Sequence, residues 1–196
     1  GLVQQIAKFQ PKKMVLLDQA ESPLYDLQFE LNQHFPLLTY EVVIGDVCNS
    51  ERMRKLFTVY SPDIVFHAAA YKHVPMMELN PAEAVQTNVH GTKILADLAL
   101  EFNAKKFIMI STDKAVNPTN VMGASKRIAE MYVQKLNDQQ RTQYITTRFG
   151  NVLGSNGSVI PLFQKQIENG GPVTVTDERI TRFFMTIPEA RSEEHT

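Results

Sequence analysis

An acidic and a basic side chain stand next to each other at Asp113 and Lys114, just after an apolar run over residues 106–110. Open α/β sheets bind their ligands beyond the carboxyl ends of the strands, so chemistry is expected at this place. An amine that is desolvated in a cleft has a lowered pKa and can accept a proton near neutral pH, and a carboxyl group with a raised pKa can donate one. The pair therefore predicts acid–base catalysis on a bound substrate, with a surface ion pair in a loop as the alternative.

A second lysine, Lys126, follows in a segment for which we expect a helix over residues 123–139, and Met122 stands four residues before it. A lysine in this place could contact the ribose of a dinucleotide cofactor while its charge assists neighbouring groups. A thioether cannot exchange a proton, so Met122 itself offers no acid–base chemistry.

Short apolar runs alternate with amphipathic, helix-length segments along most of the chain. Runs of this kind are typical of strands that are buried on both faces. Their alternation with helices favours an α/β fold with a doubly wound, parallel, Rossmann-type sheet. We expect strands over residues 14–17, 40–44, 64–67, 107–110 and 144–148, and helices over about 22–34, 50–60, 81–103 and 123–139.

The sequence opens within an amphipathic helix over residues 1–9, without the glycine-rich loop that normally follows the first strand of such a sheet. We therefore expect an N-terminally truncated fold, in which the first strand and its loop are missing. In the strand order 3-2-1-4-5-6 this strand is central, so a gap is expected between the strands at 14–17 and 63–67, and the 196 residues alone are not expected to form a stable, cofactor-competent protein.

Residues 1–190 are expected to form a partial NAD-binding Rossmann domain with the start of a substrate-binding part. Residues 186–190 suggest a helix that begins at a proline, but residues 191–196 supply no apolar face for it. We expect this last stretch to be a non-native tail, with a polar helix end as the alternative.

Several residues at the expected strand ends could hold the cofactor. Asp18 could accept hydrogen bonds from the adenosine ribose, which favours NAD over NADP, or it could simply begin a helix. Asp46 and Val47 could bind the adenine amino group and cover its ring, with a helix N-cap at Asp46 as the alternative. Small side chains would let the backbone approach the pyrophosphate and ribose, or would permit tight helix packing, at Ala68, Ala69 and Ala70.

A second group of polar residues could bind the substrate. Asn88 is unusual inside a helix, so we expect it to make a tertiary hydrogen bond, either to the backbone below the site or within the site itself. Lys72 follows the small-residue loop at the mouth of the expected cleft. A diphosphate or a uracil ring could be held by Arg148 and Asn151, and a diphosphate by Arg179 and Arg182, although a lone arginine is usually a solvated surface group.

The composition excludes several classes of function. A net charge of −1 gives no basic surface for nucleic acid. The single cysteine, Cys48, permits no internal disulfide, fits a reducing compartment, and is expected to be a small apolar filler. No apolar run reaches the length of a membrane span. His67 and His73 lack a cluster of further ligands, so we expect no metal site.

Three longer motifs resemble a known family. They are AAAYKHVP at residues 68–75, STDKAVNPTNVMGASK at 111–126 and RFGNVLGSNGSVIP at 148–161. Together they are similar to the CapD-like polysaccharide biosynthesis family, the nucleotide-sugar 4,6-dehydratases of the extended short-chain dehydrogenase/reductase superfamily, over about residues 1–190. The resemblance implies tightly held NAD and a UDP-N-acetylglucosamine-type substrate.

The resemblance also implies roles for individual residues. Hydride would leave sugar C4 and later return to C6, with no external reductant. Lys114 would remove the C5 proton, Asp113 would donate a proton to the departing C6 hydroxyl, Thr112 would bond near O4, and Lys126 would hold the cofactor ribose. Met122 departs from the Tyr-x-x-x-Lys pattern of the superfamily, which leaves a water, Lys126 or Asp113 to take the O4 proton.

The Met122 variant resembles the large, membrane-anchored branch of the family. This implies membrane helices upstream, retained C5 configuration in the product, and a location in the cytoplasm or at the cytoplasmic face of a bacterial inner membrane. We also expect a homo-oligomer. The alternatives are a nucleotide-sugar 4-epimerase, against which the Asp113–Lys114 pair argues, and a non-catalytic protein that binds NAD or a nucleotide sugar.

Overall fold

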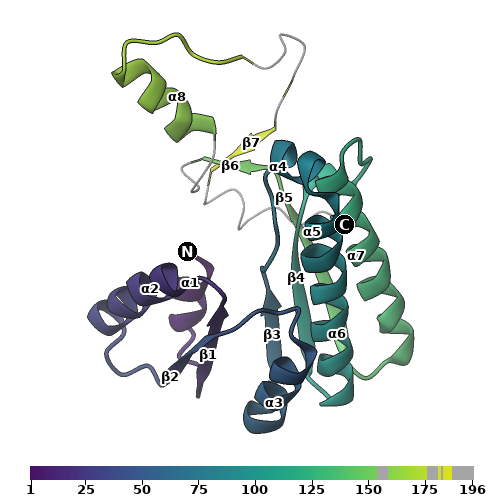
Figure 1. Ribbon diagram of the computed structural model, residues 1–196. Helices are drawn as coiled ribbons and strands as arrows, with labels where there is room; N and C mark the ends of the chain where they lie inside the picture. Colours follow the sequence, from purple (N-terminus) through teal and green to yellow (C-terminus); the bar gives the residue numbers. More distant parts are fainter. Residues whose placement is uncertain (154–158, 176–180, 182, 187–196) are drawn as a thin grey trace.

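A computed structural model describes residues 1–153, 159–175, 181 and 183–186 of the chain, and Figure 1 shows the arrangement of its elements. The helix and strand bounds are α1 (Leu2–Ala7), β1 (Met14–Asp18), α2 (Glu21–His34), β2 (Tyr40–Ile44), α3 (Ser50–Tyr60), β3 (Ile64–His67), α4 (Val74–Leu79), α5 (Pro81–Ala84), a π-helix η1 (Val85–Gly91), α6 (Thr92–Glu101), β4 (Lys106–Thr112), a 3-10 turn η2 (Asp113–Ala115), α7 (Val121–Leu136), a 3-10 turn η3 (Asn137–Gln139), β5 (Gln143–Phe149), β6 (Asn151–Val152), α8 (Val159–Glu168) and β7 (Phe184–Met185).

The strands pair in parallel, as the alternation of strands and helices predicts. One sheet has the order β1-β2, a second has the order β3-β4-β5, and a short third pairs β6 with β7. The expected gap is confirmed, because β1 and β3 do not pair with each other and lie apart in Figure 1. Apolar side chains on these two strands are exposed accordingly, namely Val15, Ile64 and Phe66.

The two larger sheets have separate apolar cores. Around β1 and β2, Met14, Leu16, Leu24 and Leu31 pack together with α1 and α2. The larger core lies between the β3-β4-β5 sheet and the helices α3, α6 and α7. Its centre is made by side chains that are fully buried on β4, with α6 and α7 supplying the opposite wall: Phe107, Met109, Ala96, Ala99, Ala129 and Val133. This core gives β4, and hence its carboxyl end, a rigid support.

The helix that the sequence predicts over residues 81–103 is not a uniform α-helix. Residues 81–101 are helical throughout, but the segment Val85–Gly91 is a π-helix between α5 and α6. Asn88 lies within this wider turn and is fully buried. π-turns inside helices are rare and are frequent at functional sites. The helix α4 was not predicted, because six residues with Pro75 at the start give too short a pattern.

The predicted helix over residues 186–190 and the predicted tail at 191–196 lie outside the described residues, except for Thr186. In the described part of the chain, no helix is both long enough and apolar enough to cross a membrane.

Candidate active site

The 3-10 turn η2 places the acid–base pair directly after β4. Thr112 Oγ1 lies 2.8 Å from Asp113 Oδ1, and the same carboxylate oxygen accepts from Lys114 Nζ at 3.0 Å and from the Lys114 backbone N–H at 2.9 Å. The Asp113 and Lys114 side chains are 38% and 33% exposed. The structure therefore brings three of the four predicted catalytic residues together, half-buried and still open to a ligand, while the fourth, Lys126, lies on α7.

The start of α7 is fixed against this turn. Asn120 caps the helix, because its side-chain oxygen accepts from the Gly123 N–H at 2.8 Å. Glu78 of α4 accepts from the Val121 N–H at 2.7 Å. A β-carbon on Gly123 would lie 2.4 Å from the backbone oxygen of Lys114, so only glycine allows this approach. Sequence reasoning missed Glu78 and the packing role of Gly123. The signal that could have placed the start of α7 was the spacing of Asn120 and Gly123, which is that of a helix cap and the amide that it caps.

Lys126 lies one turn further along α7 and is 4% exposed. Its Nζ donates to the backbone oxygen of Ile110 on β4 at 2.7 Å. Burial lowers the pKa of Lys126 to about 8, although the charge of Glu130 acts in the opposite direction. Met122 is 3% exposed and packs with Met77 and Ala84 in a small apolar cluster. An ammonium group is therefore held below the carboxyl end of β4, and Met122 fills apolar space.

Asn88 joins the loop after β3 to α7. Its Oδ1 accepts from the Tyr71 N–H at 2.8 Å, and its Nδ2 donates to the Tyr71 oxygen at 3.0 Å and to Ser125 Oγ at 2.9 Å. Ser125 Oγ in turn donates to the Met122 oxygen at 2.7 Å. The sequence allowed two roles for Asn88, and these contacts show the first of them, a tertiary hydrogen bond to the backbone. A direct contact of Asn88 with substrate stays a prediction.

His67, at the end of β3, extends this buried network as a neutral ring. Its Nε2 lies 2.7 Å from Thr92 Oγ1, and Thr92 Oγ1 donates to the Asn88 backbone oxygen at 2.7 Å. Because the hydroxyl hydrogen is used there, Nε2 must carry the ring hydrogen and donate it to Thr92. Burial, together with the nearby charge of Lys126, lowers the pKa of His67 to about 3.

We expect His67 to make the protein acid-sensitive. The pKa of histidine in an unfolded chain is about 6.5, so between this value and the lowered folded-state pKa the unfolded state binds more protons. The stabilisation is complete above the unfolded pKa and is lost as the pH falls through this window. His67→Gln keeps an N–H donor without titrating, so the pH slope of its free energy of unfolding should be shallower, by up to about 1.4 kcal/mol per pH unit. Equal slopes in urea titrations of wild type and variant would contradict this.

The residues proposed for substrate binding are differently placed. Arg148 on β5 donates from Nε and Nη2 to the fully buried Glu130, at 2.9 and 2.6 Å. Burial alone would raise the pKa of Glu130. Hydrogen bonds from Arg148 and Arg127 outweigh this effect, so the pKa of Glu130 lies below its usual value. Asn151 Nδ2 donates to the Phe183 oxygen at 3.1 Å. Lys72 is exposed, and Arg179 and Arg182 lie outside the described residues. Contact of these side chains with substrate stays a prediction.

The residues proposed for cofactor binding lie after three strands. Asp18 ends β1 with its side chain exposed, and its Oδ1 accepts from the Ala20 N–H at 2.9 Å. Asp46 Oδ1 accepts from the Cys48 N–H at 2.8 Å. The alternative of a helix cap at Asp46 is wrong, because Asn49 caps α3. Val47 is buried in the larger core, and the segment after β3 without regular structure contains Ala68, Ala69 and Ala70.

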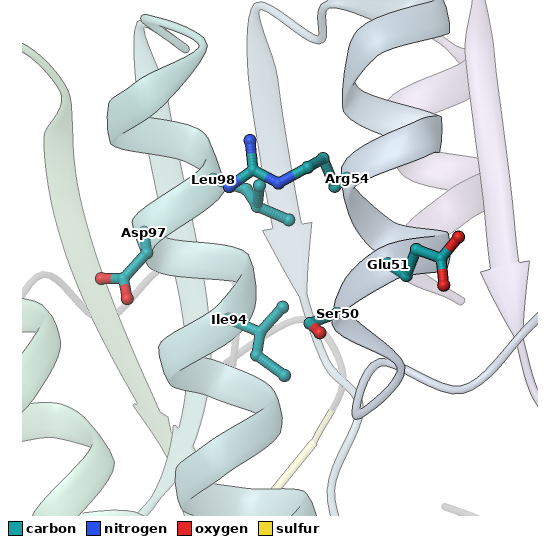
Figure 2. A pocket seen from close by; sticks show the side chains of 6 residues that line it. All are labelled: Ser50, Glu51, Arg54, Ile94, Asp97 and Leu98. Atoms are coloured by element: carbon teal, nitrogen blue, oxygen red, sulfur yellow. The ribbon is translucent and has the colours of Figure 1, made fainter.

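Other features contribute no further chemistry. Burial and the neighbouring Asp46 raise the pKa of the Cys48 thiol to about 11, so the thiol is protonated at neutral pH. Among the described residues, no three side chains of His, Cys, Asp or Glu are grouped as metal ligands would be. A depression of about 350 Å³ lies between α3 and α6, and Figure 2 shows its lining, which includes Arg54, Asp97 and Ile94 but no predicted site residue.

Relatives in sequence include dehydratases and epimerases of nucleotide sugars. The capsular polysaccharide biosynthesis protein CapD of Staphylococcus aureus is 53% identical over 96% of this chain and 32% of its own length. A UDP-N-acetylglucosamine 4,6-dehydratase (inverting) of Campylobacter jejuni is 37% identical, over 94% of this chain and 54% of its own length. A UDP-glucose 4-epimerase of Rickettsia canadensis is also 37% identical, over 91% and 52%. The chain thus spans between a third and about half of these relatives.

Solved structures share the fold. Pen from Bacillus thuringiensis superposes with a TM-score of 0.85 at 36% identity, over 96% of this chain and 57% of that protein. A double mutant of DesIV, a dTDP-glucose 4,6-dehydratase from Streptomyces venezuelae with NAD and DAU bound, superposes with a TM-score of 0.81 at 19% identity, over 97% and 65%. The predicted Rossmann-type fold is confirmed.

A family model described as polysaccharide biosynthesis protein matches residues 1–192, which is nearly the whole sequence. This match confirms the resemblance that the three motifs indicate. The chain is related to nucleotide-sugar dehydratases and epimerases of polysaccharide biosynthesis. Residues 1–192 thus belong to the polysaccharide biosynthesis protein family.

Proposed function

We propose that the protein catalyses the NAD-dependent 4,6-dehydration of a UDP-N-acetylhexosamine, with UDP-N-acetylglucosamine as the substrate to test first. The single observation that carries this proposal is the acid–base pair after β4, with Thr112, Asp113 and Lys114 joined by hydrogen bonds on a half-buried turn. A dehydratase needs an acid for the departing hydroxyl and a base for the neighbouring C–H, and this turn supplies both.

The residues present fit a dinucleotide cofactor. Lys126 offers a buried ammonium group below the end of β4, and the exposed carboxylate of Asp18 has one oxygen beyond its bond to Ala20. Lys126 would hold the nicotinamide ribose, Asp18 the adenosine ribose, and Ala68, Ala69 and Ala70 would let the backbone approach the pyrophosphate. NAD would accept a hydride from the sugar and return it.

The chain's own residues would then move the protons. Oxidation at C4 makes the neighbouring C5 proton acidic, and Lys114 would act as the general base that accepts that proton. Asp113 would protonate the C6 hydroxyl so that it leaves as water. Lys114 would finally return its proton to C5. The proton released from O4 when C4 is oxidised would make up for the one that Asp113 gives to the C6 oxygen, so no residue is consumed and the site would be ready for another turnover.

The test is to incubate the full-length protein with UDP-N-acetylglucosamine and to follow the sugar nucleotide by mass spectrometry. We expect the loss of one water. A product of unchanged mass that is epimerised at C4 would replace the dehydratase proposal with a 4-epimerase, and binding without any product would point to a non-catalytic protein. The same proposal includes four further expectations. Residues 1–190 would form a partial NAD-binding domain, and the protein would be a homo-oligomer. It would have membrane helices upstream of this chain and would lie at the inner membrane face.

A further inference from the structure

We propose that Glu130 is a positioning residue of the active site: its buried carboxylate joins β5 to α7 and keeps the neighbouring ammonium group of Lys126 charged. Glu130 takes no part in the proton transfers proposed above, although its side chain is fully buried. Burying a carboxylate costs free energy unless the charge is paired and hydrogen-bonded, so its place in the fold needs a reason. The inference rests on the proposed function, in which Lys126 holds the nicotinamide ribose.

The Glu130 carboxylate lies where α7, β4 and β5 meet. Arg148 of β5 donates to both of its oxygens, to Oε1 at 2.9 Å and to Oε2 at 2.6 Å, and Arg127 of α7 donates to Oε2 at 3.3 Å. The buried Ser111 hydroxyl of β4 has no partner at ordinary hydrogen-bond distance among the described residues, and its interaction with Glu130 helps to lower the pKa of the carboxyl group. Ser111 lies opposite Arg148 in the strand register and directly precedes Thr112. Glu130 therefore holds the ends of both strands against α7.

Lys126 stands four residues before Glu130 on α7. Side chains at this spacing lie on the same face of a helix, one turn apart. Lys126 is 4% exposed, and its Nζ donates to the backbone oxygen of Ile110. Burial lowers the pKa of Lys126 to about 8, whereas the charge of Glu130 acts to raise it. The carboxylate thus favours the ammonium form at a place where burial disfavours it.

Without the charge of Glu130, three cations would be left together, those of Lys126, Arg127 and Arg148. A guanidinium group does not lose its proton in a protein, so both arginines would stay charged. The side chains of Arg127 and Arg148 are also 38% and 36% exposed, and water stabilises their charge. Lys126 is the buried cation and the one that can titrate, so Lys126 would release its proton.

Other ionisable groups around α7 do not replace Glu130. They are neutral or already paired, and they are His67 on β3, Glu78 on α4, Asp97 on α6, and Asp113 and Lys114 on η2. His67 is a neutral ring, Asp97 pairs with Lys93 and Asp113 pairs with Lys114. Glu78 accepts from the Val121 N–H at the start of the helix. In the part of the chain that the structure describes, the buried carboxylate beside Lys126 is therefore that of Glu130.

The test measures the affinity of the full-length protein for NAD by calorimetry, after bound NAD has been removed, on both sides of the Lys126 pKa of about 8. The wild-type affinity should fall as the pH rises through this value, because the ammonium group loses its proton. Glu130→Gln keeps the shape of the side chain without its charge, so the fall should occur at a pH lower by about one unit or more. In Lys126→Arg, which stays charged, the fall should be absent, and adding Glu130→Gln should not bring it back.

Glu101→Gln is the matched control, since Glu101 pairs with Arg54 on the surface, is 49% exposed and lies outside the site. Its affinity profile should coincide with that of the wild type. If folded Glu130→Gln loses affinity at the same pH as the wild type, Glu130 only stabilises the fold and the inference is overturned. A wild-type affinity that does not fall with pH would overturn it as well.

A second variant covers the case in which Glu130→Gln does not fold. Glu130→Gln/Arg148→Met removes both charges of the buried pair, which proteins tolerate better than the loss of one partner. It should fold and still lose affinity for NAD at a lower pH than the wild type, and an unshifted profile would contradict the inference. If the wild-type protein removes no water from UDP-N-acetylglucosamine, the proposed function fails instead. The NAD profile is measured without the sugar nucleotide, so the two failures are distinguishable.

Discussion

Replacing Lys114 by alanine is expected to lower the rate of water elimination by about two to four orders of magnitude, the usual contribution of a positioned acid or base. The amine lies 3.0 Å from the carboxylate of Asp113 on the turn after β4, and both side chains remain partly exposed. The loss should appear in kcat, measured from the mass change of the sugar nucleotide. Binding of the sugar nucleotide should change little, since the backbone of the turn is kept by Thr112 and Gly123.

The stability of the Lys114→Ala variant should stay close to that of the wild type. A partly exposed ion pair contributes about 0–1 kcal/mol, so a large loss of folding free energy would contradict the catalytic assignment. Lys135→Ala is the matched control, because Lys135 pairs with Asp138 in the same way but is 80% exposed and far along α7. A small primary amine added to the solution should restore part of the activity of Lys114→Ala. The Lys135→Ala variant should keep the full activity of the wild type without any added amine.

Much of the fold could be predicted from the sequence, because it depends on patterns that are local. The strand Tyr40–Ile44 and the helix Ser50–Tyr60 have the predicted bounds, since an apolar run and an amphipathic segment each end at clear breaks. The π-turn over Val85–Gly91 could not be predicted in this way. Its residues continue the helical pattern, and the wider turn depends on what Asn88 contacts in three dimensions.

The candidate site likewise has one part that local sequence predicts and another part that it does not. Thr112, Asp113 and Lys114 are consecutive, so their proximity follows from the sequence alone. The residues that sequence reasoning missed act across long separations. Glu78 reaches Val121 over 43 positions. Glu130 reaches Arg148 over 18 positions and takes up two of the guanidinium donors that were predicted for a diphosphate. Such pairings depend on how the helices pack, which no local pattern encodes.

Replacing Gly123 by alanine is expected to lower kcat on the order of a hundredfold, as a misplacement of about 1 Å in a catalytic group can do. The new β-carbon would lie 2.4 Å from the Lys114 backbone oxygen and 3.2 Å from its carbonyl carbon. A backbone atom cannot rotate away as a side chain can, so either the turn η2 or the start of α7 must shift. Asp113 and Lys114 move with the turn, whereas the residues proposed to bind the cofactor after β1 and β3 belong to other segments.

The effect of Gly123→Ala on stability provides a second test of the same prediction. Alanine is favoured over glycine within a helix by about 1 kcal/mol, so Gly123→Ala should stabilise the protein if the site had room. We expect a lower melting temperature instead, together with the lower kcat and an almost unchanged KM. Ala124→Gly, at the next position of α7, is the matched control: it loses the helix preference without approaching Lys114, and should lower the melting temperature while kcat stays within about twofold of wild type. A Gly123→Ala protein that is both more stable and fully active would show that the close approach of α7 to the Asp113–Lys114 turn has no part in catalysis.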